Sequence, residues 1–323
     1  MANSPLKTML KHFPSFFFCF VVLYIVAYRW TTTSEHPQVQ RDFFNYVCKR
    51  FETSDQLSSF VWSHRGHFSG REVDASRSAQ QALISANVFN FDVDVSFADD
   101  VFYVAHPSKL NKFTTPSQRG DSLQTVEAFL TTLGEVRAPW SSTNRTLVVS
   151  PFVTLEPKFE ETKLWLRLLE QLSRGVGNLS PANTALVVNE PSQLRLIEEF
   201  FRDRPDASAI SVAIAYRSLP KTSADYSWSQ DIEGAEAAAR CCGLKQHSRR
   251  LRQVYMPDVK LVAELPSRFR FRRKSGSNSL LVPWLVDTEE DLMLALRQRV
   301  SGVVSNAAPA LLASLRSRFD ELC

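Results

Sequence analysis

The sequence predicts an α/β protein whose main part is a (β/α)8 TIM barrel, preceded by one N-terminal transmembrane helix. Three observations support this prediction. Short runs rich in Val, Ile and Phe alternate with longer stretches of helical period over residues 58–323. A long apolar run at 13–30 comes before them. Polar and charged residues stand at the ends of several predicted strands, where a barrel places its functional groups.

The apolar run at 13–30 is long enough, as a helix of roughly 27 Å, to cross the hydrocarbon core of a bilayer. Lys7 and Lys11 precede it, which favours a cytoplasmic tail at 1–12 and a luminal or extracellular position for everything after the run. We expect a signal anchor, and hence a single-pass membrane protein of the secretory pathway. A cleaved signal peptide is the alternative, although the run ends in aromatic and basic residues, not in small ones.

The composition fits a large soluble-type domain without a charge-driven partner. The chain has 323 residues, of which 44% are hydrophobic, enough for a sizeable core. Three of its 38 Lys and Arg residues precede residue 31, where no acid occurs, which leaves 35 basic against 34 acidic residues beyond it. A nearly neutral domain gives no reason to expect nucleic-acid binding.

Cysteines and a sequon agree with an oxidising compartment. Cys48, Cys241, Cys242 and Cys323 follow the apolar run. An even number of cysteines permits disulfides there, and the sequence leaves their pairing open. Asn144 begins the sequon Asn-Arg-Thr, which predicts a glycosylation site.

The predicted domains are a stalk and lead-in helix at 31–57 and the barrel at 58–323. Strands are predicted where four to nine residues are rich in Val, Ile or Phe: Ser59–Ser63, Val88–Val95, Val101–Ala105, Thr146–Thr154, Thr184–Asn189, Ala209–Tyr216, Gln253–Met256, Leu280–Val286 and Gly302–Ser305. Helices are predicted where apolar residues recur every three or four positions: Asp74–Ala86, with Asp74 as its cap, Lys158–Arg174, Pro191–Arg202, Thr288–Arg299 and Ala308–Leu322.

Nine strands, two of which form a hairpin, with helices between the others favour the barrel. A doubly wound open sheet is the alternative. That fold binds phosphate at a glycine-rich loop after its first strand, and no such loop follows Ser59–Ser63.

Three carboxylates at strand ends suggest a metal site. Asp92 and Asp94 are two residues apart, so their side chains share one face of a strand, where like charges repel unless a cation lies between them. Glu156 follows the next strand of the barrel and adds a third hard oxygen ligand. Such a set suits Mg²⁺ or Ca²⁺ better than zinc.

Histidines and cations accompany these carboxylates. His64 and His106 end two strands and could act as general acid and base. Arg65 and Lys158 offer positive charge to an anionic group such as a phosphate. Glu156 and Lys158 could instead form an ordinary helix start. Trp284 is a candidate for the substrate pocket, with the barrel core as its alternative place.

The order His64-Arg65-Gly66, Asp92-x-Asp94, His106 and Glu156-x-Lys158 resembles the glycerophosphodiester phosphodiesterase superfamily of phospholipase C-like TIM barrels. The resemblance covers about residues 59–315. It implies that the two histidines are the acid/base pair, that the three carboxylates bind the metal, and that Arg65 and Lys158 hold the phosphate. The implied activity is a membrane-anchored, metal-dependent hydrolase acting on a glycerophosphodiester or lysophospholipid.

Some positions depart from that family. Asp92 stands where the family usually has Glu, and Pro157 lies between Glu156 and Lys158, where a proline removes a strand donor. The Asp-Val-Ser-Phe at 94–97 is similar to sphingomyelinase D-like phospholipases, and the Ala-His-Pro at 105–107 is similar to menorin-like extracellular proteins. The second likeness implies the alternative function, a non-catalytic binding or adhesion domain on the same barrel.

Overall fold

The computed structural model describes residues 41–66, 77–136, 138–142, 145–149, 151–176, 179–189, 191–204, 207, 210–216, 253–264 and 280–323. Asn144, Cys241, Cys242 and the predicted tail and anchor at 1–30 lie outside this part of the chain. Within it, no helix has the length and apolar character needed to cross a bilayer.

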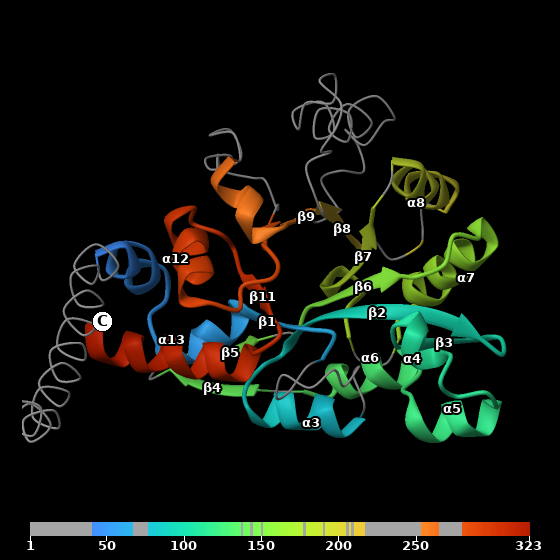
Figure 1. Cartoon of the computed structure of the whole chain (residues 1–323), viewed down its shortest axis with the longest axis horizontal. Helices are drawn as coiled ribbons and strands as arrows, with labels where there is room; N and C mark the ends of the chain where they lie inside the picture. Colours follow the sequence, from blue (N-terminus) through green and yellow to red (C-terminus); the bar gives the residue numbers. More distant parts are fainter. Residues whose placement is uncertain are drawn as a thin grey trace, which may run out of the picture.

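The main sheet contains eight parallel strands in the order β10-β9-β8-β7-β6-β2-β1-β11, with β3 antiparallel beside β2 (Figure 1). The strands are β1 Val61–His64, β2 Asn90–Ala98, β3 Val101–Val104, β6 Val153–Pro157, β7 Thr184–Val188, β8 Ser211–Tyr216, β9 Gln253–Pro257, β10 Leu280–Leu281 and β11 Val303–Ser305.

The sheet curls until its two end strands approach each other. The Val304 N–H donates to Pro283 O at 2.9 Å, and the Val286 N–H donates to Val304 O at 2.8 Å. The Ser301 N–H donates to Leu281 O at 2.6 Å. Backbone bonds therefore connect the segment that follows β10 with β11, and the carboxyl ends of the parallel strands surround one rim.

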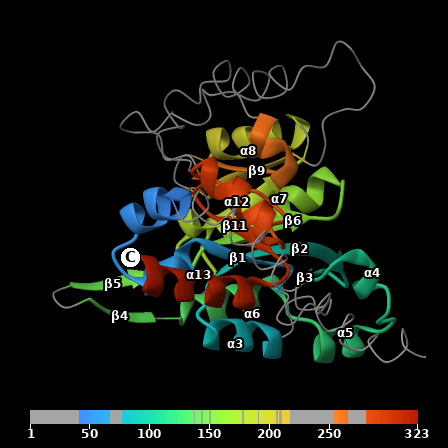
Figure 2. The ribbon, with the colours of Figure 1, turned by 60° about the vertical axis from the view of Figure 1, so that its left-hand side comes forward.

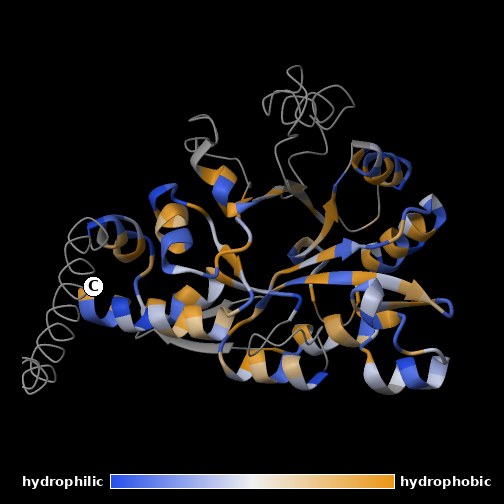
Figure 3. Cartoon of the chain, viewed as in Figure 1, coloured by the Kyte–Doolittle hydropathy of each residue, from blue (hydrophilic) through white to orange (hydrophobic). Residues whose placement is uncertain are grey.

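Helices cover the outside of the curled sheet and turn their apolar sides toward it (Figure 3). They are α3 Arg77–Ser85, α4 Pro107–Leu110, α5 Pro116–Ser122, α6 Val126–Gly134, α7 Thr162–Ser173, α8 Pro191–Asp203, α12 Glu289–Arg297 and α13 Ala308–Leu322, with short helices η1 Phe44–Cys48, η2 Ser54–Ser59, η3 Pro181–Asn183 and η4 Val259–Glu264. A separate hairpin, β4 Ala138–Ser142 with β5 Arg145–Val149, projects from the side of this body (Figure 2).

Successive side chains along a strand point to opposite faces of the sheet, and the two faces belong to two separate hydrophobic clusters. On β2, Phe91, Val93 and Val95 belong to the large cluster between sheet and helices. A smaller cluster lies on the other face of the sheet, inside the curl, and includes Trp62 and Phe152, whose ring centroids are 5.2 Å apart. Because side chains alternate with period two, Asp92 and Asp94 point to the inner face, on the side of this inner cluster nearer the carboxyl ends of the strands.

Two predicted elements have other boundaries in the structure. The run Thr146–Thr154, predicted as one strand, divides into β5 and β6, which belong to different sheets. The helix predicted from Lys158 begins at Thr162, because Lys158 still donates its N–H to Val95 O at 2.8 Å, as a strand residue does. Pro157 is tolerated as the last residue of β6.

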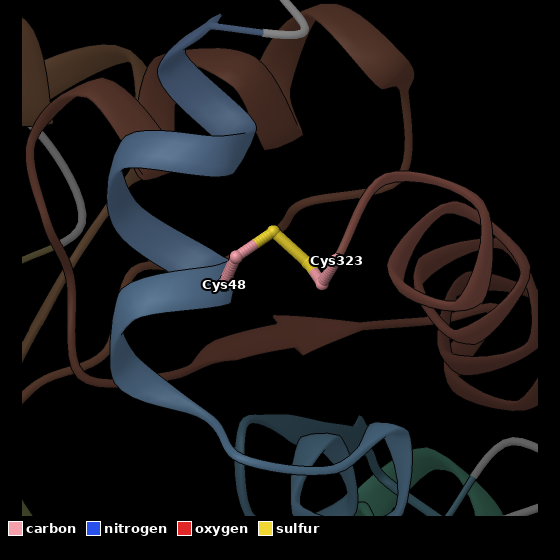
Figure 4. The surroundings of a disulfide bond; sticks show 2 residues. All are labelled: Cys48 and Cys323. Carbon is pink, nitrogen blue, oxygen red and sulfur yellow. A yellow bond between two sulfur atoms is a disulfide. The ribbon is translucent and has the colours of Figure 1, made fainter.

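A disulfide joins the two ends of the described chain. Cys48 at the end of η1 bonds to Cys323, which follows α13 directly, and the two Cα atoms are 5.4 Å apart (Figure 4). Beside it, Phe43 and Val47 are buried, and Arg50 donates to the carbonyl oxygens of Val300 and Ser301 at 2.7 and 2.8 Å. The lead-in segment is therefore packed onto the barrel. Of the pairings that the sequence leaves open, the structure contains this one.

Candidate functional site at the carboxyl rim of the sheet

The rim begins where the inner apolar layer ends. Trp62, Phe152 and their neighbours form the last apolar layer inside the curled sheet. The next side chains on the inner face, toward the carboxyl ends of the strands, are polar. His64 follows Trp62 by two residues on β1 and is the register partner of Asp92 on β2. Asp94 is in turn the register partner of Glu156 on β6. Strand pairing alone therefore brings four of the predicted residues to the same edge.

The turn after β1 brings Arg65 over this edge. Arg65 has a φ of 52° and Gly66 a φ of 69°, left-handed values that are uncommon for a residue with a side chain such as Arg. The Arg65 N–H donates to Asp92 O at 2.5 Å, which holds the turn against β2. Its Nε lies 2.8 Å from Asp94 Oδ2. The turn therefore directs the guanidinium back over the strand that carries the aspartates.

A chain of ion pairs continues from Asp94. Lys158 Nζ lies 2.8 Å from Asp94 Oδ1 and 2.7 Å from Glu156 Oε1. Asp94 is 4% exposed, and the Lys158 and Glu156 side chains are 14% exposed. Asn189, which follows β7, donates from Nδ2 to the same Glu156 oxygen at 3.3 Å. Two cations thus balance the two carboxylates in a largely buried setting, where an unpaired charge is costly.

Asp92 lies two residues before Asp94 on β2, is also buried, and has a different partner. Its Oδ1 accepts a hydrogen bond from Thr154 Oγ1 at 2.6 Å. Burial raises the pKa of the Asp92 carboxyl to about 6, and the Thr154 hydrogen bond only partly opposes this shift. The negative charge of Asp94 adds to the increase in this pKa.

This raised pKa predicts how Asp92→Asn changes stability. The pKa of Asp92 is about 6 in the fold and near 3.8 when unfolded, so folding takes up a proton between these values. Its stabilising contribution is complete below pH 3.8 and is lost as the pH rises through about 6. Asparagine can accept the same Thr154 hydrogen bond without ionising. In EDTA, we expect the unfolding free energy of Asp92→Asn relative to wild type to increase by up to about 3 kcal/mol between pH 4 and pH 8.

Denaturant unfolding at several pH values measures this difference. Thr154→Val is the matched control, because it removes the hydrogen bond and keeps the titrating group. A difference between Asp92→Asn and wild type that is the same at every pH would contradict the raised pKa.

His64 belongs to a network that the sequence did not suggest. Its Nδ1 lies 2.7 Å from Asn306 Oδ1. Asn306 donates from Nδ2 to Asp287 Oδ2 at 2.6 Å and from its backbone N–H to Oδ1 at 2.8 Å. Because these bonds direct the amide oxygen toward the ring, His64 carries its proton on Nδ1. Burial lowers the pKa of His64, so the imidazole is mostly neutral at pH 7 and Nε2 is its basic nitrogen.

His106 is held in the opposite tautomer. It is the N-cap of α4, and its Nδ1 accepts from the Ser108 N–H at 3.3 Å and lies 2.8 Å from Ser108 Oγ. A neutral ring that accepts at Nδ1 carries its proton on Nε2. His106 follows β3, whose Val104 is the register partner of Val95, so the backbone places it beside the segment with the aspartates.

The structure thus joins six predicted residues by direct contacts or strand register: His64, Arg65, Asp92, Asp94, Glu156 and Lys158. Backbone pairing also brings His106 and Trp284 toward this rim. Trp284 is half-buried beside the inner apolar cluster, and its backbone pairs with Asp258 after β9. Thr154 and Asn189 were expected at strand ends of the rim but were given no role, and Asp287 and Asn306 were not predicted as site residues. Asn306 directly follows a strand, so the strand-end rule already applied to the other residues could have found it.

The carboxylates suit a hard cation chemically but are not arranged around one. Within the described residues, no three His, Cys, Asp or Glu side chains gather as a metal-binding group. The point shared by Asp94 and Glu156 is taken by the Lys158 ammonium, and Asp92 is turned toward Thr154. As they stand, these side chains do not fit a resident Mg²⁺ or Ca²⁺, and the predicted metal stays a prediction.

Comparison with solved structures identifies this fold. No protein-family model matches the chain, and no curated protein matches it either. A glycerophosphodiester phosphodiesterase of Parabacteroides distasonis superposes with a TM-score of 0.52 and 16% identity, over 80% of this chain and 97% of the other. A phosphodiesterase of Oleispira antarctica, in complex with the product sn-glycerol-3-phosphate, gives 0.50 and 11% identity, over 83% and 99%. The chain therefore has the phospholipase C-like TIM-barrel fold, as its motif order predicts.

Proposed function

We propose that this barrel, which shares its fold with glycerophosphodiester phosphodiesterases, is a phosphodiester hydrolase that acts on a glycerophosphodiester or a lysophospholipid. The observation that supports this most is the pair of histidines at one rim, His64 with a basic Nε2 and His106 with Ser108 Oγ at its Nδ1, so that one ring can serve as a base and the other, once protonated, as an acid. A phosphodiester hydrolase needs these two functions: one group to remove a proton from the nucleophile and one to protonate the leaving oxygen.

In this proposal His64 is the base and His106 is the acid. Neutral His64 takes a proton at Nε2 from a water or from a neighbouring hydroxyl of the substrate, and that oxygen attacks phosphorus. Asp287 lies behind Asn306 and favours the positive charge that then forms on the ring, since its charge raises the pKa of His64. His106 acts as the acid in its imidazolium form, in which Nδ1 can donate to Ser108 Oγ, 2.8 Å away, while Nε2 gives its proton to the departing alcohol oxygen and the ring becomes neutral. Charge on the phosphoryl oxygens is stabilised by Arg65, whose Nε lies 2.8 Å from Asp94 Oδ2.

Membrane attachment through 13–30, and a luminal or extracellular position for the barrel, belong to the same proposal. The disulfide between Cys48 and Cys323 supports an oxidising compartment. A lysophospholipid would then reach the rim from the membrane that carries the anchor.

The direct test is a substrate screen with the full-length protein in detergent. We expect the protein to convert a glycerophosphodiester or a lysophospholipid into a phosphomonoester or a cyclic phosphodiester, which ³¹P NMR distinguishes. A phosphomonoester substrate is the matched control and should remain intact. If a protein with an intact cooperative unfolding transition cleaves none of these diesters, with or without Mg²⁺ and Ca²⁺, the proposed hydrolase is wrong.

A second candidate function is the non-catalytic binding domain. One observation favours it: both predicted phosphate-binding cations, Arg65 and Lys158, are already paired with carboxylates of the same site. A barrel that neutralises its own rim can be stable without substrate or metal. In that case the screen shows no turnover, and the histidine variants bind partners as the wild type does.

A further inference from the structure

The contacts of Lys158 indicate which cation occupies the carboxylate pair at the rim. Its ammonium lies 2.8 Å from Asp94 and 2.7 Å from Glu156, two of the three carboxylates that the sequence assigns to a metal. We propose that Lys158 is the resident cation of this carboxylate pair, and that a divalent cation binds there only by displacing the ammonium group. The proposal concerns the same rim as the hydrolase but does not depend on turnover.

The backbone holds Lys158 where it can fill this position. Its N–H donates to Val95 O at 2.8 Å, which continues the pairing of β6 with β2 for one residue beyond Pro157. Lys158 and Glu156 are two residues apart on this extended segment, so both side chains project to the inner face. The register partner of Glu156 is Asp94, and the ammonium lies between them. The contact thus follows from strand register as well as from one side-chain rotamer.

Burial makes a cation at this point necessary. Asp94 is 4% exposed and the Glu156 side chain is 14% exposed, so two neighbouring carboxylates would repel strongly if nothing neutralised them. One ammonium with three N–H donors can serve both. A divalent ion on the same two oxygens would lie within a few ångströms of the ammonium, and the repulsion between these two positive charges favours departure of the ammonium.

Displacement has a further consequence for anions. An ammonium that leaves the carboxylates becomes available to a phosphate oxygen at the same rim, so a divalent cation and a phosphodiester would each strengthen the binding of the other. Without the divalent cation, Lys158 stays on its carboxylates, and of the two predicted phosphate-binding residues Arg65 alone faces the anion. Binding of the cation thereby favours binding of the anion, and binding of the anion favours binding of the cation.

Calorimetric titration of Mg²⁺ and of Ca²⁺ into the full-length protein tests the competition. Lys158→Met should bind the divalent cation about tenfold or more tightly than the wild type, because no ammonium has to leave. Lys163→Met is the matched control: Lys163 is exposed in the first turn of α7 and should leave the affinity unchanged. Adding Glu156→Gln to Lys158→Met should abolish the gain. Equal affinity in Lys158→Met and wild type, or no binding by either, overturns the proposal.

A second measurement on the wild type applies even if Lys158→Met does not fold. Labelling with acetic anhydride, followed by mass spectrometry, reports how exposed each amine is. Labelling of Lys158 should increase several-fold as Mg²⁺ or Ca²⁺ is added, while that of Lys163 stays constant. Labelling of Lys158 that does not change up to millimolar cation overturns the proposal. A protein that shows the displacement but cleaves no diester refutes the proposed hydrolase alone.

Discussion

Replacement of His106 by alanine is expected to lower kcat on a cleaved diester by about 10²–10⁴-fold, the usual contribution of a general acid. The ring is the N-cap of α4, so its loss also removes an acceptor for the Ser108 N–H. His106→Asn keeps a capping side chain but has no titrating group. It should therefore restore the unfolding temperature without restoring the rate, which separates a catalytic role from a capping role.

His64→Ala should cause a loss of similar size, and the pH dependence should identify which histidine is the base. Because burial lowers the pKa of His64, the rate should decrease only at acidic pH, where this ring becomes protonated. Asp287→Asn removes a charge that raises the pKa of His64, so the acidic limb should move to lower pH. His67→Ala is a control, since no role is assigned to that residue. An acidic limb that does not move in Asp287→Asn would contradict the Asp287–Asn306–His64 network.

Removal of the disulfide by Cys48→Ser/Cys323→Ser is expected to cost about 2–5 kcal/mol of folding stability. The bond closes a loop with a sequence separation of 275, and a constraint on so long a loop removes much of the freedom of the unfolded chain. The unfolding temperature should decrease on the order of 10 °C, as followed by calorimetry.

The reduced wild type supplies the comparison for this prediction. Dithiothreitol should lower the unfolding temperature of the wild type to that of the double variant and have no effect on the variant itself. An unfolding temperature that is equal in oxidised wild type and double variant would show that packing of the lead-in segment suffices without the bond.

The barrel could be predicted because its strands have a strong local signal. The run 184–188, for example, is buried on both faces, with Leu186 and Val188 in the outer cluster and Ala185 and Val187 in the inner one. The helices α5 and α6 were missed. Helix α5 has no apolar stripe and is defined by its capping box at Thr115. Helix α6 has one, at Val126, Phe129, Leu130 and Leu133, but it extends over only nine residues. The hairpin of β4 and β5 was missed because its second strand is followed so closely by β6.

The site could be predicted only in part, because some of its contacts depend on the closed sheet. Asp92 and Asp94 share one face of one strand, a relation that period two already fixes. His64 and Asn306 are 242 residues apart in the sequence and meet because β1 is paired with β11. The partner of Lys158 could not be predicted either, since a lysine after a strand can face a bound anion or its own carboxylates. Only the register of β6 against β2 decides this.

The bond between Cys48 and Cys323 also determines how the molecule would carry mechanical load. Tension applied to the N-terminal side of the chain enters the described body through η1 and reaches Cys48 almost at once. From there the covalent path leads directly to Cys323, at the end of α13, and leaves the sheet between them outside the line of force. A barrel tethered by its N-terminal segment could therefore be pulled without being unwound strand by strand, and the rim with His64 and Asp94 would keep its geometry under strain.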